Sequence, residues 1–257
     1  MVLKIQNVSK NFGGIKALKD VTFSINKGEI YGLIGPNGAG KTTMFNLITN
    51  IFEPTSGDIV FNGENITALK SYKITEKGIC RTYQNIRLFP QMSALQNVMV
   101  GGHCRSKAGV FSSVFRTKSQ RNEEIELTKK AEELLELVGL LEFKDTFAEN
   151  LAYGQQRRLE IARALASNPS LLLLDEPAAG MNEKETDSLY DLIKTVQARG
   201  ITVLIIEHDM PLVMKLCDRI TVLNFGEKLA EGTPEEIQSN EAVIEAYLGK
   251  EEEEEIA

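Results

Sequence analysis

A glycine-rich segment followed by Lys-Thr constrains the fold of this chain more than any other feature. The segment reads Gly35-Pro-Asn-Gly-Ala-Gly-Lys-Thr42 and matches the pattern G-x-x-x-x-G-K-[ST]. An apolar run, Ile30–Ile34, precedes it, and a helical pattern follows it to about Thr49. In such a loop the backbone N–H groups turn inward, and the helix N-terminus adds partial positive charge, so phosphate groups can bind. We therefore expect an α/β fold built around a phosphate-binding loop.

The loop offers several kinds of phosphate ligand. The Lys41 ammonium group would reach the β- and γ-phosphates of a nucleoside triphosphate, and the Thr42 hydroxyl would bind a Mg²⁺ ion beside them. A glycine-rich turn with a chance Lys-Thr is the alternative, and the flanking strand and helix patterns argue against it. The candidate nucleotide-binding residues of the loop are Gly35, Pro36, Asn37, Gly38, Ala39, Gly40, Lys41, Thr42 and Thr43.

Two carboxylates follow a second apolar run. The run Leu171–Leu174 contains no polar residue and is followed by Asp175 and Glu176. At the end of a buried strand Asp175 can hold a hydrated Mg²⁺ ion, and Glu176 can activate a water molecule as a general base. An apolar strand that ends in Asp-Glu is common by itself. The pair indicates these two roles because a phosphate-binding loop precedes it in the chain.

Two more polar residues come directly after predicted strands. Gln84 follows Ile79–Tyr83, and its amide can ligate Mg²⁺ or orient a water molecule. His208 follows Ile201–Glu207 and can bond a γ-phosphate, although a lone histidine is more often a surface or core residue. The predicted catalytic residues are therefore Lys41, Gln84, Glu176 and His208, and the predicted Mg²⁺ ligands are Thr42, Gln84 and Asp175.

The order of strand and helix patterns predicts one α/β domain. Continuous apolar runs such as Ile201–Ile206 are typical of parallel strands buried on both faces, and the first 25 residues alternate like antiparallel strands. Residues 1–86 and 167–235 are expected to form a mainly parallel core with an N-terminal antiparallel β subdomain. Residues 87–166 are expected to form an inserted helical subdomain, and residues 236–257 a C-terminal helix and an acidic tail.

Composition and charge restrict the partners and the cellular compartment that we expect for this protein. The net charge of the 257 residues is −7, of which Glu251–Glu255 contribute five negative charges as a solvated, frayed tail. The remainder shows no basic stripe, so no nucleic-acid partner is expected. No apolar run approaches the ~20 residues that span a bilayer, and no signal peptide is evident, which predicts a cytoplasmic protein. Its cysteines, Cys80, Cys104 and Cys217, lie too far apart for a zinc motif.

The most discriminating segment is Leu151-Ala-Tyr-Gly-Gln155, which leads into a helical pattern. Together with the phosphate-binding loop, Gln84, Asp175-Glu176 and His208, in this order, it resembles the ATPases of ABC transporters over residues 2–248. The resemblance implies a P-loop NTPase core of RecA-like type. It places Leu151–Gln155 at the family's L-S-G-G-Q signature, Gln84 in its Q-loop and His208 in its switch loop. It also matches Phe12 to the aromatic residue that stacks on adenine.

For such ATPases the resemblance implies a head-to-tail dimer in which each ATP lies between the loop of one subunit and the signature of the other. Ala152, Tyr153, Gly154 and Gln155 are then nucleotide-binding residues, and ATP and Mg²⁺ are the expected cofactors. Ala152 stands where serine is usual, Tyr153 where glycine is usual, and Asn182 replaces the aspartate of the D-loop. These departures bear on rate more than on activity, because the predicted catalytic residues are all present.

The variant signature resembles the ATP-binding subunit of branched-chain amino acid importers, as do Ile206-Glu-His-Asp-Met and the closing Ala246-Tyr-Leu-Gly. A loop-rich segment at 103–120 fits the larger of the two ATPase subunits of such importers. The resemblance implies a paralogous ATPase subunit, or a second copy, as dimer partner, together with membrane-spanning permease subunits and, indirectly, a solute-binding protein. The chain would be peripheral on the inner face of the cell membrane, with Asn85–Pro90 beside the groove for a permease helix.

Three alternatives stay open. A lipid or lipopolysaccharide exporter ATPase has the same fold, and Ala152-Tyr153 favours the importer. A chromosome or translation ATPase would carry long heptad repeats or two tandem cassettes, whereas this chain has one phosphate-binding loop and only a short helical pattern at Glu123–Val138. A scaffold for iron–sulfur cluster assembly is the third.

Overall fold

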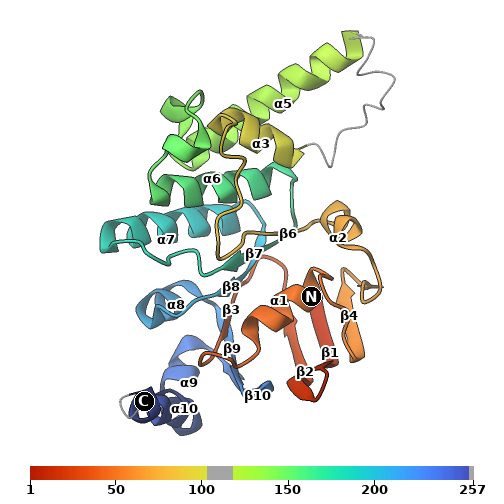
Figure 1. Ribbon diagram of the computed structural model, residues 1–257, viewed down its shortest axis with the longest axis vertical. Helices are drawn as coiled ribbons and strands as arrows, with labels where there is room; N and C mark the ends of the chain where they lie inside the picture. The colour runs from red at the N-terminus through yellow and green to blue at the C-terminus, as the bar shows by residue number, and fades with distance from the viewer. Residues whose placement is uncertain (103–117, 255–257) are drawn as a thin grey trace.

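The computed structural model describes residues 1–102 and 118–254. Most of the loop-rich segment predicted at 103–120 therefore lies outside the described residues. The described chain forms a six-stranded sheet and a four-stranded sheet, with helices around the larger sheet (Figure 1). Among the described residues, no helix combines the length and the apolar character needed to cross a membrane.

The larger sheet is parallel except at one edge. Its strand order is β10-β9-β3-β8-β7-β6, and only β10 pairs antiparallel, with β9. The strands β3, β7 and β8 are buried at every residue, as expected for parallel strands covered on both faces. The six strands are β3 (Ile30–Ile34), β6 (Ile79–Arg81), β7 (Leu171–Asp175), β8 (Thr202–Ile206), β9 (Arg219–Asn224) and β10 (Glu227–Gly232).

The smaller sheet is antiparallel and packs against the first helix of the core. Its order is β2-β1-β4-β5, with Leu3 opposite Ile25 and Phe61. Met44 and Phe45 of helix α1 are fully buried in one cluster with the inner side chains of this sheet, so α1 sits between the two sheets. These elements are β1 (Leu3–Phe12), β2 (Ile15–Ile25), α1 (Lys41–Ile48), β4 (Ser56–Phe61) and β5 (Glu64–Asn65).

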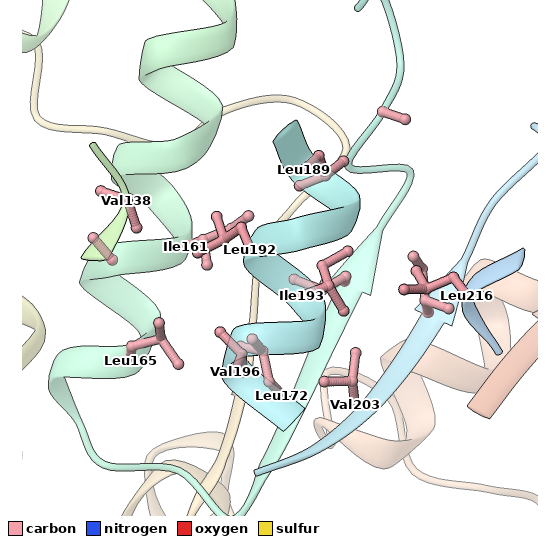
Figure 2. Close-up of a cluster of buried hydrophobic side chains, with 14 of the residues drawn as sticks. Val138, Ile161, Leu165, Leu172, Leu189, Leu192, Ile193, Val196, Val203 and Leu216 are labelled. Carbon is pink, nitrogen blue, oxygen red and sulfur yellow. The ribbon is translucent and has the colours of Figure 1, made fainter. Parts of the chain in front are cut away.

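A second cluster joins the inserted helices to the sheet. Figure 2 shows Ile161 and Leu165 of α6 facing Leu192 and Val196 of α7, with Leu172 of β7 beside them. Helix α6 (Tyr153–Ala166) therefore packs on α7 (Glu183–Ala198), which covers the sheet (Figure 1). The other helices are α2 (Ser71–Lys77), α3 (Ala94–Gly102), α5 (Lys118–Leu137), α8 (Met210–Leu216), α9 (Pro234–Gln238) and α10 (Glu241–Glu254), with short 3₁₀ turns η2 (Leu141–Phe143) and η3 (Ala148–Asn150).

The predicted fold class is confirmed. The mainly parallel sheet, the antiparallel sheet and the helical insertion are all present. The division at residues 86, 166 and 235 stays a prediction. Helix α10 extends into the glutamate run as far as Glu254, where the sequence suggested a frayed tail; glutamate is a good helix former, so the run can continue a helix that has already begun.

Gly101 lies where α3 crosses α6, and a larger residue should not fit there. A Cβ atom at Gly101 would lie 2.0 Å from the Arg163 carbonyl oxygen, which is backbone and cannot rotate away. We therefore expect Gly101→Ala to lower the free energy of unfolding by about 2 kcal/mol, although alanine is the better helix former. Urea unfolding followed by circular dichroism measures the change. Gly14→Ala is the control, since a Cβ there meets nothing within 4 Å, and equal stability of the two variants would contradict the steric argument.

Candidate active site

Residues from five separate segments line one pocket at the carboxyl edge of the parallel sheet. The pocket has a volume of about 310 Å³, which lies at the small end of ligand-binding cavities. Because β3, β7 and β8 are parallel, the residues that follow them emerge at the same edge. The lining residues are Ala17, Asn37, Gly38, Ala39, Gly40, Lys41, Thr42, Thr43, Gln84, Glu176 and His208. The structure thus brings together all four predicted catalytic residues.

The glycines of the loop have positive φ angles, a backbone conformation that other residue types rarely adopt. Gly35, Gly38 and Gly40 have φ values of +145°, +78° and +104°. A Cβ at Gly35 would lie 2.0 Å from the Leu223 carbonyl oxygen, so the loop packs tightly against β9. At Gly38 a Cβ would meet nothing within 4 Å. The loop is therefore closely packed at Gly35 and open at Gly38, which lines the pocket.

The Lys41 ammonium group lies inside the curve of this loop. Lys41 is 6% exposed, and its Nζ donates hydrogen bonds to the carbonyl oxygens of Gly35 at 2.6 Å and Pro36 at 3.0 Å. Both acceptors are backbone carbonyl groups of the loop, which hold the ammonium group within it. The N-terminus of α1 points at the same place. The loop therefore fits the phosphates of a nucleotide.

Glu176 is held at both carboxylate oxygens. Gln84 Nε2 donates to Glu176 Oε2 at 2.7 Å, and His208 Nε2 lies 2.8 Å from Glu176 Oε1. The backbone of Glu176 has a φ of +48°, a left-handed conformation that is unfavourable for this residue type. Strain of this kind persists where the surrounding contacts fix it, and it is concentrated at functional sites. Three residues distant in sequence thus form one hydrogen-bonded group.

Glu207 lies next to this group and bonds the backbone on either side of it; it was not predicted from the sequence. Its two carboxylate oxygens accept hydrogen bonds from the backbone N–H groups of Ala178 at 2.6 Å and His208 at 3.0 Å. Burial raises the pKa of the Glu207 carboxyl, and these hydrogen bonds oppose the rise. Glu207 therefore ties the segment after Glu176 to the segment that carries His208. Its position at the end of an apolar strand was the only sequence signal.

The predicted metal ligands divide into two groups. Thr42 and Gln84 line the pocket, and their oxygen atoms suit a hard cation such as Mg²⁺. Asp175 is absent from that lining, and its side chain is 4% exposed. Its Oδ2 lies 2.6 Å from Nη2 of Arg81, whose Nη1 donates to Asn46. This buried ion pair was not predicted from the sequence.

Phe12, the predicted adenine-stacking residue, lies outside the pocket lining. It ends β1, is 40% exposed and packs edge-on against Phe52 with ring centroids 5.2 Å apart. Lys10 Nζ lies 5.0 Å from the Phe12 ring centroid. An exposed aromatic face beside a lysine remains available for stacking, so the adenine contact stays a prediction.

The signature residues lie at the start of α6 and also outside the pocket lining. Ala152 precedes the helix, and its backbone N–H donates to Gln155 Oε1 at 2.9 Å. A Cβ at Gly154 would lie 2.7 Å from Glu185 Oε1, so a glycine lets α6 approach α7. The side chain of Asn182 caps α7 by accepting from the Glu185 N–H at 3.1 Å. Asn182 therefore has a structural role that the departure from aspartate did not suggest.

The fold and the pocket define a P-loop ATPase, and comparison with known families narrows the class. The family model described as ABC transporter matches residues 18–179, and the one described as branched-chain amino acid ATP-binding cassette transporter matches residues 227–253. The chain belongs to the ABC transporter family, as one of its ATP-binding proteins.

Several named relatives match along nearly the whole chain. The chain is 46% identical to the high-affinity branched-chain amino acid transport ATP-binding protein BraF of Pseudomonas aeruginosa, with 97% of this chain and 98% of BraF covered. LivG of Escherichia coli, with the same description, is also 46% identical at the same coverage. The lipopolysaccharide export system ATP-binding protein LptB of Haemophilus influenzae is 34% identical, again with 97% and 98% covered.

Solved structures of ATP-binding cassettes show the same fold. The ADP conformation of MJ1267, an ATP-binding cassette of an ABC transporter, superposes with a TM-score of 0.84 at 33% identity, covering 96% of this chain and 98% of that one. A dimeric, post-hydrolysis state of the cassette MJ0796 bound to ADP and Pi superposes with a TM-score of 0.77 at 30% identity, covering 90% and 98%.

The Arg81–Asp175 pair should contribute to stability mainly by preventing an unpaired buried charge. We expect Arg81→Met to lower the free energy of unfolding by about 3 kcal/mol, because the Asp175 carboxylate would stay buried without its partner. Urea unfolding measures the loss. Lys19→Met removes an exposed pair with Glu227 and should change stability by less than about 1 kcal/mol. A loss at Arg81 no larger than at Lys19 would show that Asp175 finds another partner or water.

Proposed function

We propose that this chain is the ATP-hydrolysing subunit that powers an ABC importer for branched-chain amino acids. The hydrogen-bonded group of Glu176, Gln84 and His208, which lines one pocket with the Lys41 loop, carries the hydrolytic part of this proposal. The substrate class is supported by the names of BraF and LivG and by the family match at residues 227–253.

In the proposed reaction, Glu176 acts as the general base. Its carboxylate takes a proton from a water molecule, the water oxygen forms a bond to the γ-phosphorus of ATP, and the bond from that phosphorus to the bridging oxygen of ADP breaks. Gln84 and His208 hold the carboxylate, so its position is set before ATP arrives. Lys41 and the backbone N–H groups of the loop stabilise the charge on the phosphates.

A Mg²⁺ ion, when bound, neutralises charge on the β- and γ-phosphates. Thr42 and Gln84 would hold this ion, and the Asp175 carboxylate would act on its hydration shell. This indirect role is supported by the place of Asp175, which is paired with Arg81 and absent from the pocket lining.

We infer that the chain works as a dimer from the position of the signature residues. Tyr153 and Ala152 are exposed and belong to a different surface from the residues that line the pocket. The N-terminus of α6 could cap the γ-phosphate of an ATP held by a paralogous subunit or a second copy. The dimeric MJ0796 cassette with ADP and Pi supports a dimer as the working form. Loss of the γ-phosphate would then open the dimer.

A groove on the other side of the Gln84 segment is the proposed docking site for a permease subunit. It has a volume of about 410 Å³ and is lined by residues from α2, β6, α3 and α6, with Tyr83 and Phe89 beside the Gln84 segment. Ile51 and Phe89 are both 45% exposed here, so apolar surface is available for an amphipathic helix. The chain would thus sit on the inner face of the membrane, with a solute-binding protein acting across it.

The exporter reading is the second candidate, because LptB matches over the whole chain. Its 34% identity is lower than the 46% shared with BraF, and the family match at residues 227–253 favours the importer. The two readings share the same hydrolytic chemistry and differ in the membrane subunits that dock in the groove.

Glu176→Gln tests the hydrolytic role. We expect kcat for ATP hydrolysis to fall by about 10²–10⁴-fold, because an amide cannot accept the proton. The Kd for ATP should stay close to the wild-type value, and size-exclusion chromatography with ATP should show a trapped dimer. Glu142→Gln removes an exposed carboxylate elsewhere and should hydrolyse ATP normally. Wild-type turnover by Glu176→Gln would exclude Glu176 as the general base.

Co-purification tests the transport role. The tagged chain carrying Glu176→Gln, solubilised with ATP in mild detergent, should bring down a second ATPase subunit and two membrane-spanning subunits. Adding Phe89→Glu should abolish recovery of the membrane subunits, because a charge would enter the apolar groove. Ile244→Glu on α10 is the matched control and should retain them, since α10 lies at the end of the molecule opposite to α3 and α6 in Figure 1. Recovery of soluble partners alone would overturn the transport proposal.

A further inference from the structure

A buried arginine connects the signature helix to the backbone at Gln84. Arg157, one turn into α6, is fully buried. Its Nη1 donates to the carbonyl oxygen of Tyr83 at 2.5 Å, and its Nη2 donates to the carbonyl oxygen of Gln84 at 2.7 Å. The guanidinium group thus grips two consecutive peptide units, one of which belongs to the residue that bonds Glu176.

A buried glutamate on the same helix supports this arginine. Glu160 is 1% exposed, and its Oε2 lies 3.3 Å from Arg157 Nη1. Its Oε1 accepts from the Arg87 N–H at 3.1 Å, and Arg163 donates to the Arg87 carbonyl oxygen. Burial raises the pKa of Glu160, and the neighbouring Arg157 and Arg163 oppose the rise. Charged side chains of α6 therefore hold the backbone at both ends of the segment from Tyr83 to Arg87.

The signature tyrosine contacts the same arginine. Arg157 Nη2 donates to the Tyr153 hydroxyl at 3.1 Å, the same nitrogen that bonds the Gln84 carbonyl. Tyr153 is 47% exposed at the start of α6, and a Cβ at Gly180 would lie 3.5 Å from its ring. A displacement of the Tyr153 hydroxyl therefore acts on the group that holds Gln84. One hydrogen-bonded chain runs from the signature surface to Glu176.

We propose that Arg157 is a positioning residue that sets the Gln84 side chain against Glu176, and that the Tyr153 hydroxyl sets Arg157. This proposal rests on the proposed function, in which Gln84 and Glu176 act in hydrolysis. In the proposed dimer Tyr153 faces the ATP held by the partner, whereas Gln84 serves the ATP of its own subunit. Within each subunit, the contacts from Tyr153 through Arg157 to Gln84 therefore connect the surface that faces the partner's ATP with the site that holds the subunit's own ATP.

Arginine is required here because of its geometry as well as its charge. A guanidinium group presents its N–H donors in a planar fork, which can reach two adjacent carbonyl oxygens and a hydroxyl at once. A lysine retains the positive charge next to Glu160 but cannot reproduce that fork. Arg157→Lys therefore separates the positioning effect from the loss of a buried charge.

A double-mutant cycle between Arg157→Lys and Gln84→Ala tests the proposal. We expect Arg157→Lys to lower kcat for ATP hydrolysis about 10-fold in the wild-type background, with little change in KM, because misplacement of a catalytic group lowers the rate. In the Gln84→Ala background the same substitution should change kcat by less than about 2-fold, because the side chain through which it acts is absent. Arg199→Lys, at the exposed end of α7, should change neither background.

Amide hydrogen exchange supplies a readout that does not depend on catalysis. Arg157→Lys should speed exchange in a peptide covering residues 83–88, while exchange in β7 and β8 stays as in the wild type. Tyr153→Phe removes only one hydroxyl at an exposed ring, so folding is preserved. It should lower kcat about 2–5-fold in the wild-type background and leave the Gln84→Ala background unchanged.

The outcomes separate this proposal from the proposed function. Equal fold-losses in both backgrounds, or unchanged kcat and exchange in folded Arg157→Lys, would overturn the positioning role and leave the ATPase role of Gln84 intact. If Gln84→Ala alone hydrolysed ATP at the wild-type rate, the role of Gln84 itself would be wrong, and the positioning role would fall with it. Non-additive loss of kcat together with faster exchange at 83–88 supports the proposal.

Discussion

The parallel pairing of β8 with its two neighbours, β7 and β3, is the constraint on which the rest of the site depends. Asp175 lies opposite Ile206 in the register of β7 and β8, so Glu176 and the segment carrying His208 leave the sheet together. A shift of this register would displace Glu176 relative to the segment that carries His208. The 2.8 Å contact between Glu176 and His208 thus follows from the packing of the apolar strands beneath it.

Buried charges connect the elements that the hydrophobic clusters leave free to shift. Arg81 of β6 forms an ion pair with Asp175 of β7. Arg157 donates a hydrogen bond to the carbonyl oxygen of Tyr83, and Glu207 accepts one from the N–H of Ala178. Replacing both partners of a buried ion pair by apolar side chains is often neutral or stabilising, whereas removing one partner is costly, so the value of such a pair lies in geometry more than in net stability. Each of these contacts is made to a residue that lies within two positions of a pocket-lining residue.

Sequence patterns predicted the elements well because apolar periodicity reports burial directly. They also predicted which residues follow each parallel strand, and the pocket gathers Lys41, Gln84, Glu176 and His208 as expected. Partners of buried polar side chains were not predictable, because the Arg157 contacts span more than 70 residues of sequence and depend on how α6 crosses the core. The same reason explains why the Arg81 pair was missed: a strand pattern shows that a residue is buried without showing what it faces.

The distribution of the nucleotide-binding candidates gives the proposed dimer its physical basis. Within one chain the loop residues Asn37–Thr43 line a single pocket, and Ala152–Gln155 do not take part in it. The α6 N-terminus has backbone N–H groups that need an acceptor, and an exposed Tyr153 stands beside them. A phosphate held by a neighbouring subunit would meet that need. Because Arg157 reaches from Tyr153 to Gln84, completing one site would then change the geometry of the other, and the two ATP molecules would be coupled through α6 itself.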